Sequence, residues 1–219
     1  MTADRTSRSA QPSGAAARGF AYPRGILGRL GGHLMARGSE AASREAAGLL
    51  DVRPGDRILE VGYGPGVLIK HLAGCTPAAR VTGVDPSPVM RDMAQRRCAA
   101  EIITGRADPR LGTATDTALA DAAFEHVVSV NNVLFWDGIP AGLAELRRVL
   151  CPGGSLAVAF HSRTAPSRHE RRIGLPEQDA DRIQAAIGDV FGSVTRHDLR
   201  HLTAFTAARP QYAGPLTGG

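Results

Sequence analysis

The sequence predicts an α/β fold built on a doubly wound sheet, mostly parallel and closed by an antiparallel C-terminal hairpin strand. Two observations predict this class. Short apolar runs that suit buried strands alternate with segments of helical spacing, which is typical of a parallel sheet. The apolar run at residues 57–61 also leads directly into a glycine-rich turn that opens a helix, which is the Rossmann-like way of approaching a nucleoside ligand.

The expected elements follow one another along the chain. Residues 57–61 are nearly all apolar, as a central parallel strand buried on both faces should be. Ser39 suits the N-cap of a helix with apolar residues at helical spacing. Pro109 fits only a strand at an edge or a bulge of the sheet. Strands are predicted at 57–61, 80–84, 107–111, 126–131, 155–161, 194–199 and 202–207. Helices are predicted at 39–50, 66–73, 87–103, 139–150 and 177–191.

The chain has the length of one domain, with 219 residues of which 43% are hydrophobic. Residues 1–19 are rich in Ser, Ala, Gly and Arg without periodicity and are predicted to be a disordered tail. Residues 20–210 are the predicted domain, with a helical lid at about 20–50, and 211–219 are a C-terminal tail. The sequence shows no apolar run of about 18 residues and no signal peptide, so we expect a cytoplasmic protein without a membrane segment.

The formal net charge is +5, which raises the question of a nucleic-acid partner. The arginines are scattered, Lys70 is the only lysine, and no basic run is interleaved with aromatic residues, so nucleic acid is not the expected partner. Cys75, Cys98 and Cys151 form no C-x-x-C pair and are interpreted as buried small hydrophobic residues. Neither a disulfide framework nor a zinc site is therefore predicted.

The glycine turn is preceded by an acid, in the pattern Glu60-x-Gly62-x-Gly64-x-Gly66. A dinucleotide-binding fingerprint requires a small residue where this chain has Val67. A carboxylate beside the turn suits a ligand with a cationic amino-acid tail and would repel a pyrophosphate. The spacing therefore favours a nucleoside that carries an amino acid over a nicotinamide dinucleotide.

These features resemble motif I of class I S-adenosylmethionine-dependent methyltransferases, with Asp85 at the acidic position that follows it. Three further blocks resemble the second strand, the fourth strand and the turn before the fifth strand of that family: 84–90, 124–132 and 145–154. The resemblance implies S-adenosylmethionine as cofactor, S-adenosylhomocysteine as product, and a small-molecule acceptor such as a metabolite or natural product. An RNA methyltransferase or a non-catalytic S-adenosylmethionine-binding protein would share the cofactor motifs, so these two alternatives stay open.

The resemblance also implies which residues meet the cofactor. The glycine turn would line the methionine moiety, Asp85 would accept hydrogen bonds from the ribose hydroxyls, and Asn131 would meet the amino-acid end. The full predicted set is Glu60, Gly62, Tyr63, Gly64, Gly66, Asp85, Pro86, Ser87, Met90, Thr113, Ala114 and Asn131.

The position after the third strand departs from the family pattern. The family often has Gly-Asp-Ala there, with the acid accepting from the adenine amino group, whereas this chain has Gly112-Thr-Ala114. The adenine partner is therefore expected to be Thr113, the backbone at Ala114 or nearby Asp116.

Methyl transfer from a sulfonium is an in-line displacement, so the protein must align the acceptor, exclude water and, for some acceptors, remove a proton. The candidate bases are His161 at the end of the predicted fifth strand and His33 in the predicted lid. No residue that would orient His161 is identified, which favours alignment without a base. No metal is predicted. The candidate substrate pocket consists of Tyr22, Asn132, Phe135 and Trp136.

Overall fold

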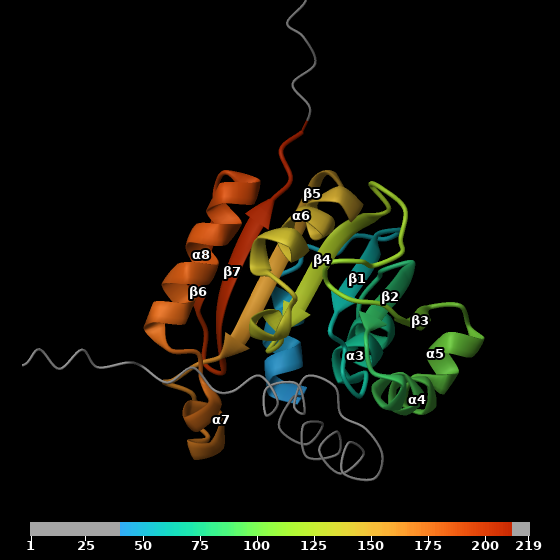
Figure 1. Cartoon of the computed structure of the whole chain (residues 1–219). Helices are drawn as coiled ribbons and strands as arrows, with labels where there is room; N and C mark the ends of the chain where they lie inside the picture. The colour runs from blue at the N-terminus through green and yellow to red at the C-terminus, as the bar shows by residue number, and fades with distance from the viewer. Residues whose placement is uncertain (1–39, 212–219) are drawn as a thin grey trace, which may run out of the picture.

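The computed structural model describes residues 40–211, whose strands form one seven-stranded sheet with helices on both faces (Figure 1). The strand order is β3-β2-β1-β4-β5-β7-β6. β7 pairs antiparallel with β5 and β6, and the other strand pairs are parallel. The strands are β1 (Arg57–Val61), β2 (Arg80–Asp85), β3 (Ala107–Leu111), β4 (Phe124–Val130), β5 (Leu150–His161), β6 (Thr195–Asp198) and β7 (Leu202–Ala208). The predicted fold class, including the antiparallel C-terminal hairpin, is confirmed.

Successive strand residues point to opposite faces of the sheet, and helices cover both faces, so side chains on both faces are buried. Ile58 of β1 packs into a core with α3, α4 and residues 40–48, whereas Leu59 packs into a second core with α6 and α8. The helices are α3 (Val67–Cys75), α4 (Pro88–Arg97), α5 (Ala99–Ile103), α6 (Ile139–Val149), α7 (Arg168–Ile173) and α8 (Glu177–Phe191), with a 3₁₀ turn η1 at Val133–Phe135.

Three predicted elements differ from the structure. The helix expected at 87–103 is broken at Cys98, which separates α4 from α5 and is fully buried with its Sγ 3.5 Å from the carbonyl oxygen of Gly66. The fourth strand begins two residues earlier than predicted, at Phe124, and β5 begins at Leu150 instead of residue 155. These ends were missed because apolar patterning does not mark where pairing with a neighbour begins.

Pro109 lies where the sequence predicts. It is in β3, which pairs only with β2 and forms one edge of the sheet. An edge strand has one side without a neighbouring strand, so a proline that lacks the N–H is tolerated there. The short elements α7 and η1 were not predicted, since six and three residues contain too few turns for periodicity to be read. No helix within residues 40–211 is long and apolar enough to span a membrane.

The carboxyl ends of the parallel strands meet at one edge of the sheet, the lower edge in Figure 1. The glycine turn follows β1 at this edge, and β2, β4 and β5 end there at Asp85, Val130 and His161. Ligands of open α/β sheets bind outside such carboxyl ends, so this edge holds the candidate site.

Candidate cofactor and acceptor site

The three glycines after β1 all have left-handed backbone conformations, with φ of 72° at Gly62, 52° at Gly64 and 79° at Gly66. Two of them are also required by close packing. A Cβ at Gly62 would lie 2.3 Å from Nδ2 of Asn132, and one at Gly66 would lie 2.9 Å from Cα of Ala94. A Cβ at Gly64 would meet no atom of residues 40–211 within 4 Å. The backbone of Gly64 therefore has an open side where a ligand can approach closely.

Asn132 clamps the glycine turn to the end of β4. Its Nδ2 donates to the carbonyl oxygen of Val61 at 2.6 Å. Its Oδ1 accepts from Oγ of Ser129 at 2.9 Å and from Nε1 of Trp136 at 2.7 Å. The sequence suggested that Asn132 lines a substrate pocket, but in the structure its Nδ2 holds the start of the glycine turn and its Oδ1 is bonded to Ser129 and Trp136.

Two buried carboxylates stand beside the glycine turn. Asp85 is 7% exposed, and its two oxygens accept from the backbone N–H of Gly64 at 3.0 Å and of Ser87 at 2.9 Å. Burial raises the pKa of Asp85 to about 6, against the lowering effect of these hydrogen bonds. Each carboxylate oxygen has a second lone-pair site, so Asp85 retains the capacity to accept from ribose hydroxyls.

Glu60 is 4% exposed, and burial together with the nearby charge of Asp85 raises its pKa well above the ordinary value. Its Oε2 is buried and has no hydrogen-bond partner among residues 40–211. An unsatisfied buried carboxylate oxygen is costly unless a donor or a cation reaches it. A ligand with an ammonium group and ribose hydroxyls supplies both kinds of partner, so the two carboxylates fit S-adenosylmethionine.

Other members of the predicted cofactor set have structural roles. Tyr63 is 3% exposed in the core, and its hydroxyl donates to the carbonyl oxygen of Arg110 at 2.8 Å. Met90 is also buried in the core at 2% exposure. Ser87 caps α4 by accepting from the N–H of Met90 at 3.4 Å, and the half-buried Pro86 precedes it in the turn. Tyr63 and Met90 therefore contribute to the site by packing in the core next to it.

The loop after β3 is closed on itself at Thr113. Its N–H donates to the carbonyl oxygen of Asp116 at 2.9 Å, and its Oγ1 accepts from the N–H of Asp116 at 3.0 Å. Ala114 follows at 6% exposure. The Thr113 hydroxyl therefore orders the loop in which an adenine partner was predicted, and the Asp116 side chain is exposed.

Glu145 of α6, the helix that packs in the second core, forms hydrogen bonds that hold the same loop. It was not predicted as a site residue. Its Oε1 accepts from the N–H of Thr117 at 3.0 Å, and its Oε2 accepts from Nε of Arg148 at 2.7 Å. Nη2 of Arg148 also donates to the carbonyl oxygen of Leu119 at 2.8 Å. Glu145 lies in the sequence block 145–154 that resembles the family, but the sequence does not indicate which distant loop the Glu145 carboxylate contacts.

The candidate acceptor end lies where β4 and β5 finish. Asn131 has a φ of 59°, and its Oδ1 accepts from the N–H of His161 at 2.8 Å, which links the two strand ends. His161 is partly buried, and its Nδ1 is buried with no hydrogen-bond partner among residues 40–211. Burial lowers the pKa of His161, an effect that neighbouring Glu170 opposes. A neutral imidazole with an unengaged nitrogen has the form that a general base requires.

The remaining predicted pocket residues are placed differently. The ring of Trp136 packs on Gly142, where a Cβ would lie 2.4 Å from its Cε3, so this side chain belongs to the packing of α6. Phe135 is 46% exposed and is free to face a ligand. Tyr22 and His33 lie outside the described residues. Within residues 40–211, no three His, Cys, Asp or Glu side chains group closely enough to hold a metal.

Comparison with known proteins identifies the domain that contains this site. The profile of the family described as "Methyltransferase domain" matches residues 58–154, which contain the glycine turn, Asp85 and Glu145. Residues 58–154 therefore form a methyltransferase domain, as the resemblance to class I S-adenosylmethionine-dependent methyltransferases predicted. Its fold resembles that of a proposed S-adenosyl-L-methionine-dependent methyltransferase from Methanococcus maripaludis, with a TM-score of 0.69 and 17% identity over 83% of this chain and 93% of that one.

Curated relatives agree with this methyltransferase assignment. The chain is 28% identical to the uncharacterized methyltransferase YdaC of Bacillus subtilis, over 72% of this chain and 84% of YdaC. It is 37% identical to a demethylmenaquinone methyltransferase of Symbiobacterium thermophilum, over 51% of this chain and 45% of the relative. The chain thus spans less than half of that second relative.

Proposed function

We propose that this methyltransferase transfers a methyl group from S-adenosylmethionine to a small-molecule acceptor, a metabolite or natural product. The observation that carries the cofactor assignment is the pair Glu60 and Asp85, two buried carboxylates beside the open side of Gly64. The small-molecule acceptor is supported by relatives named as demethylmenaquinone methyltransferases and a fungal O-methyltransferase. We also propose that the enzyme acts without a metal ion.

The residues divide the work of the site between them. The bound cofactor supplies a methyl group already activated by a positive sulfur. Glu60 holds the cationic amino group, Asp85 accepts from the ribose hydroxyls, and the clamp through Asn132 keeps the turn in place. The segment from Asn131 to Phe135 positions the acceptor, and His161 takes its proton where the acceptor carries one. Alignment and exclusion of water account for the rest of the catalysis.

Calorimetry with S-adenosylhomocysteine tests the cofactor assignment. We expect the full chain to bind S-adenosylhomocysteine and not NAD, and Asp85→Ala to weaken binding by about 1.5–3 kcal/mol, as for hydrogen bonds to a charged group. Asp189→Ala, which removes an exposed carboxylate on α8, is the matched control and should bind like the wild type. Binding of NAD without S-adenosylhomocysteine would overturn the assignment.

A panel of phenols, quinols and amines, read out by S-adenosylhomocysteine formation, tests the acceptor class, with transfer RNA as the contrasting substrate. On a phenol or quinol acceptor, which must lose a proton, His161→Asn should lower kcat by about 100-fold with cofactor affinity unchanged, because a positioned base contributes 10²–10⁴-fold. A loss under about fivefold would show that alignment alone drives transfer. Turnover of RNA and of no small molecule would reject the acceptor class.

A further inference from the structure

The exposed side of α7 gathers basic side chains at the carboxyl edge of the sheet. Arg168, His169, Arg171 and Arg172 line a surface hollow of about 700 Å³. The three arginines are spaced i, i+3 and i+4, which brings them to one face of the helix. Within residues 40–211, none of these three arginines forms an ion pair with a carboxylate. Their charge is therefore directed to the hollow and the solvent.

The one acid of α7 is turned away from this face. Glu170 is 6% exposed, and its two oxygens lie 3.3 Å from Nδ1 of His201 at the turn before β7. Its N–H donates to Oγ of Ser167, which caps the helix. The contact anchors α7 to the β6–β7 hairpin and removes the only negative charge from the basic face.

The basic face is also partly ordered in advance. Nη1 of Arg171 donates to the carbonyl oxygens of Ala165 and Pro166, both at 2.8 Å. These bonds hold the guanidinium while leaving its other N–H groups available, since arginine has five donors. Ordering a side chain before binding reduces the entropy that a ligand must overcome.

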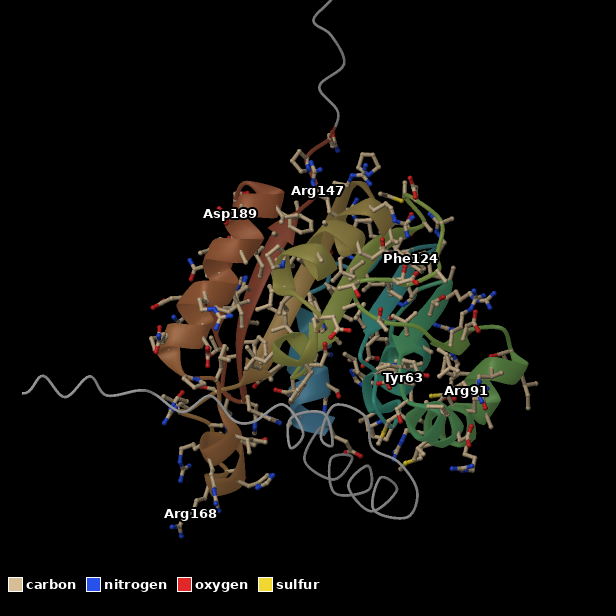
Figure 2. The ribbon with its side chains drawn as sticks, viewed as in Figure 1. Tyr63, Arg91, Phe124, Arg147, Arg168 and Asp189 are labelled. Carbon is tan, nitrogen blue, oxygen red and sulfur yellow. The ribbon has the colours of Figure 1, made fainter. Side chains whose placement is uncertain are left out.

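The segment that carries α7 begins and ends at the candidate acceptor site. The N–H of Ser162 donates to the carbonyl oxygen of His201 at 2.8 Å, and the N–H of Leu175 donates to the carbonyl oxygen of His161 at 3.0 Å. Both ends are thus fastened beside His161. Figure 2 shows Arg168 at the far end of α7, beyond the carboxyl edge, and Arg147 at the opposite end of the molecule.

We propose that the α7 arginines form an anion subsite that binds a phosphate-type group of the methyl acceptor. Guanidinium groups match phosphate oxygens in paired hydrogen bonds, and several of them facing one hollow favour a multiply charged anion over a single carboxylate. The identity of the anion as part of the acceptor rests on the proposed function. The binding of the anion itself does not. Ile173, 53% exposed at the end of α7, extends the face with an apolar group. The phosphate-type group therefore belongs either to a small acceptor that is free in solution or to the headgroup of a lipid acceptor.

Inorganic pyrophosphate is the probe for the first source. Titration calorimetry on the full chain at low salt should show binding that weakens as salt is raised. The double variant Arg168→Gln/Arg172→Gln should bind pyrophosphate at least tenfold more weakly. The control Arg96→Gln/Arg147→Gln removes the same charge from exposed positions of α4 and α6 and should stay within twofold of the wild type. An equal loss in both variants would mean a general charge effect and would reject the subsite.

Vesicles test the second source. Sedimentation with phosphatidylglycerol vesicles, compared with phosphatidylcholine alone, should show α7-dependent binding if the phosphate is a lipid headgroup. If the wild type binds neither pyrophosphate nor anionic vesicles, the subsite is rejected. S-adenosylhomocysteine binding is measured on every variant and should not change. Loss of anion binding with intact cofactor binding rejects only the subsite, whereas anion binding without cofactor binding rejects only the proposed function.

Discussion

At the scale of single residues, the three glycines of one turn are present for different reasons. Gly66 and Gly62 leave room for protein atoms, the first for the backbone of α4 and the second for Asn132. A Cβ at Gly64 would meet no atom of the described residues 40–211, although its φ of 52° still favours glycine. The structure therefore separates two glycines that close packing requires from one that leaves an open side on the turn.

Gly64→Ala and Gly66→Ala should consequently fail in different ways. Gly64→Ala should lower the free energy of unfolding by about 1–2 kcal/mol, the cost of a left-handed alanine, while weakening S-adenosylhomocysteine binding more than tenfold. Gly66→Ala should cost a further 1–3 kcal/mol or so because its Cβ would press on Cα of Ala94. Urea unfolding and calorimetry on both variants measure the two effects. Wild-type affinity in Gly64→Ala would show that no ligand approaches that side.

The places of site residues were predictable from sequence only where the residues lie in or directly after the strands that carry the motif. The spacing of Glu60, the glycines and Asp85 was enough to place two buried carboxylates beside a left-handed turn. The clamp by Asn132 was not predictable, since it reaches Val61, 71 positions earlier in the chain. Trp136 was assigned to a pocket because aromatics line both pockets and cores, and its packing on Gly142 is visible only in three dimensions.

At the scale of elements, α6 connects one core of the sheet to the loop that follows β3. Hydrogen bonds from Arg148 are the main cause that lowers the pKa of Glu145 to about 2, outweighing burial, and Thr117 adds to the effect. A carboxyl with a lowered folded pKa stabilises the fold above its unfolded pKa, near 4.5, and loses that contribution as the pH falls toward 2.

Glu145→Ala should lower the free energy of unfolding at pH 7 by about 1–3 kcal/mol, because the N–H of Thr117 and the Arg148 guanidinium lose their acceptor. The difference from the wild type should shrink as the pH falls from 4.5 toward 2. Glu177→Ala, which removes an exposed carboxylate from α8, should leave the melting temperature nearly unchanged. Denaturant titrations over this pH range measure the difference, and a gap that does not close at low pH would rule out the charged contact as its cause.

The elements themselves were largely predictable, because buried parallel strands and two-turn or longer helices leave clear apolar patterns. One signal was available and not used, and one break in a helix had no signal. Ser167 and Glu170 have the spacing of a capping box, which marks the start of α7. Cys98 is a buried residue in the middle of the predicted helix at 87–103, but its contact with the carbonyl oxygen of Gly66 comes from a distant segment and has no local pattern.

At the scale of the whole molecule, the fold buries two carboxyl groups, Glu60 and Asp85, beside the glycine turn. Glu60 and Asp85 both have a raised pKa in the folded state, so between the unfolded and folded values the folded state holds protons that the unfolded chain has released. Their contribution to stability therefore falls as the pH rises. For Asp85 the interval runs from about 3.8 to about 6, which corresponds to about 3 kcal/mol. Such a cost is expected where a site is built to meet a cation and hydroxyl donors.

Glu60→Gln should therefore stabilise the protein without cofactor and weaken the cofactor complex. Neutralising the buried acid should raise the melting temperature at pH 8 by about 2–8 °C, from a gain of about 1–2 kcal/mol. The gain should be smaller at pH 5 than at pH 8, because the raised pKa of Glu60 favours its protonated form as the pH falls and Asp85, with a pKa of about 6, is largely protonated at pH 5. Histidines with lowered pKa, such as His161, make stability rise with pH over the same range, but they are common to both proteins and cancel in the comparison. Saturating S-adenosylhomocysteine should reverse the order, because its ammonium group compensates Glu60 only in the wild type. If Glu60→Gln lowered the melting temperature without cofactor at pH 8, the acid would have an undetected partner and the charge at this edge would not be a cost of function.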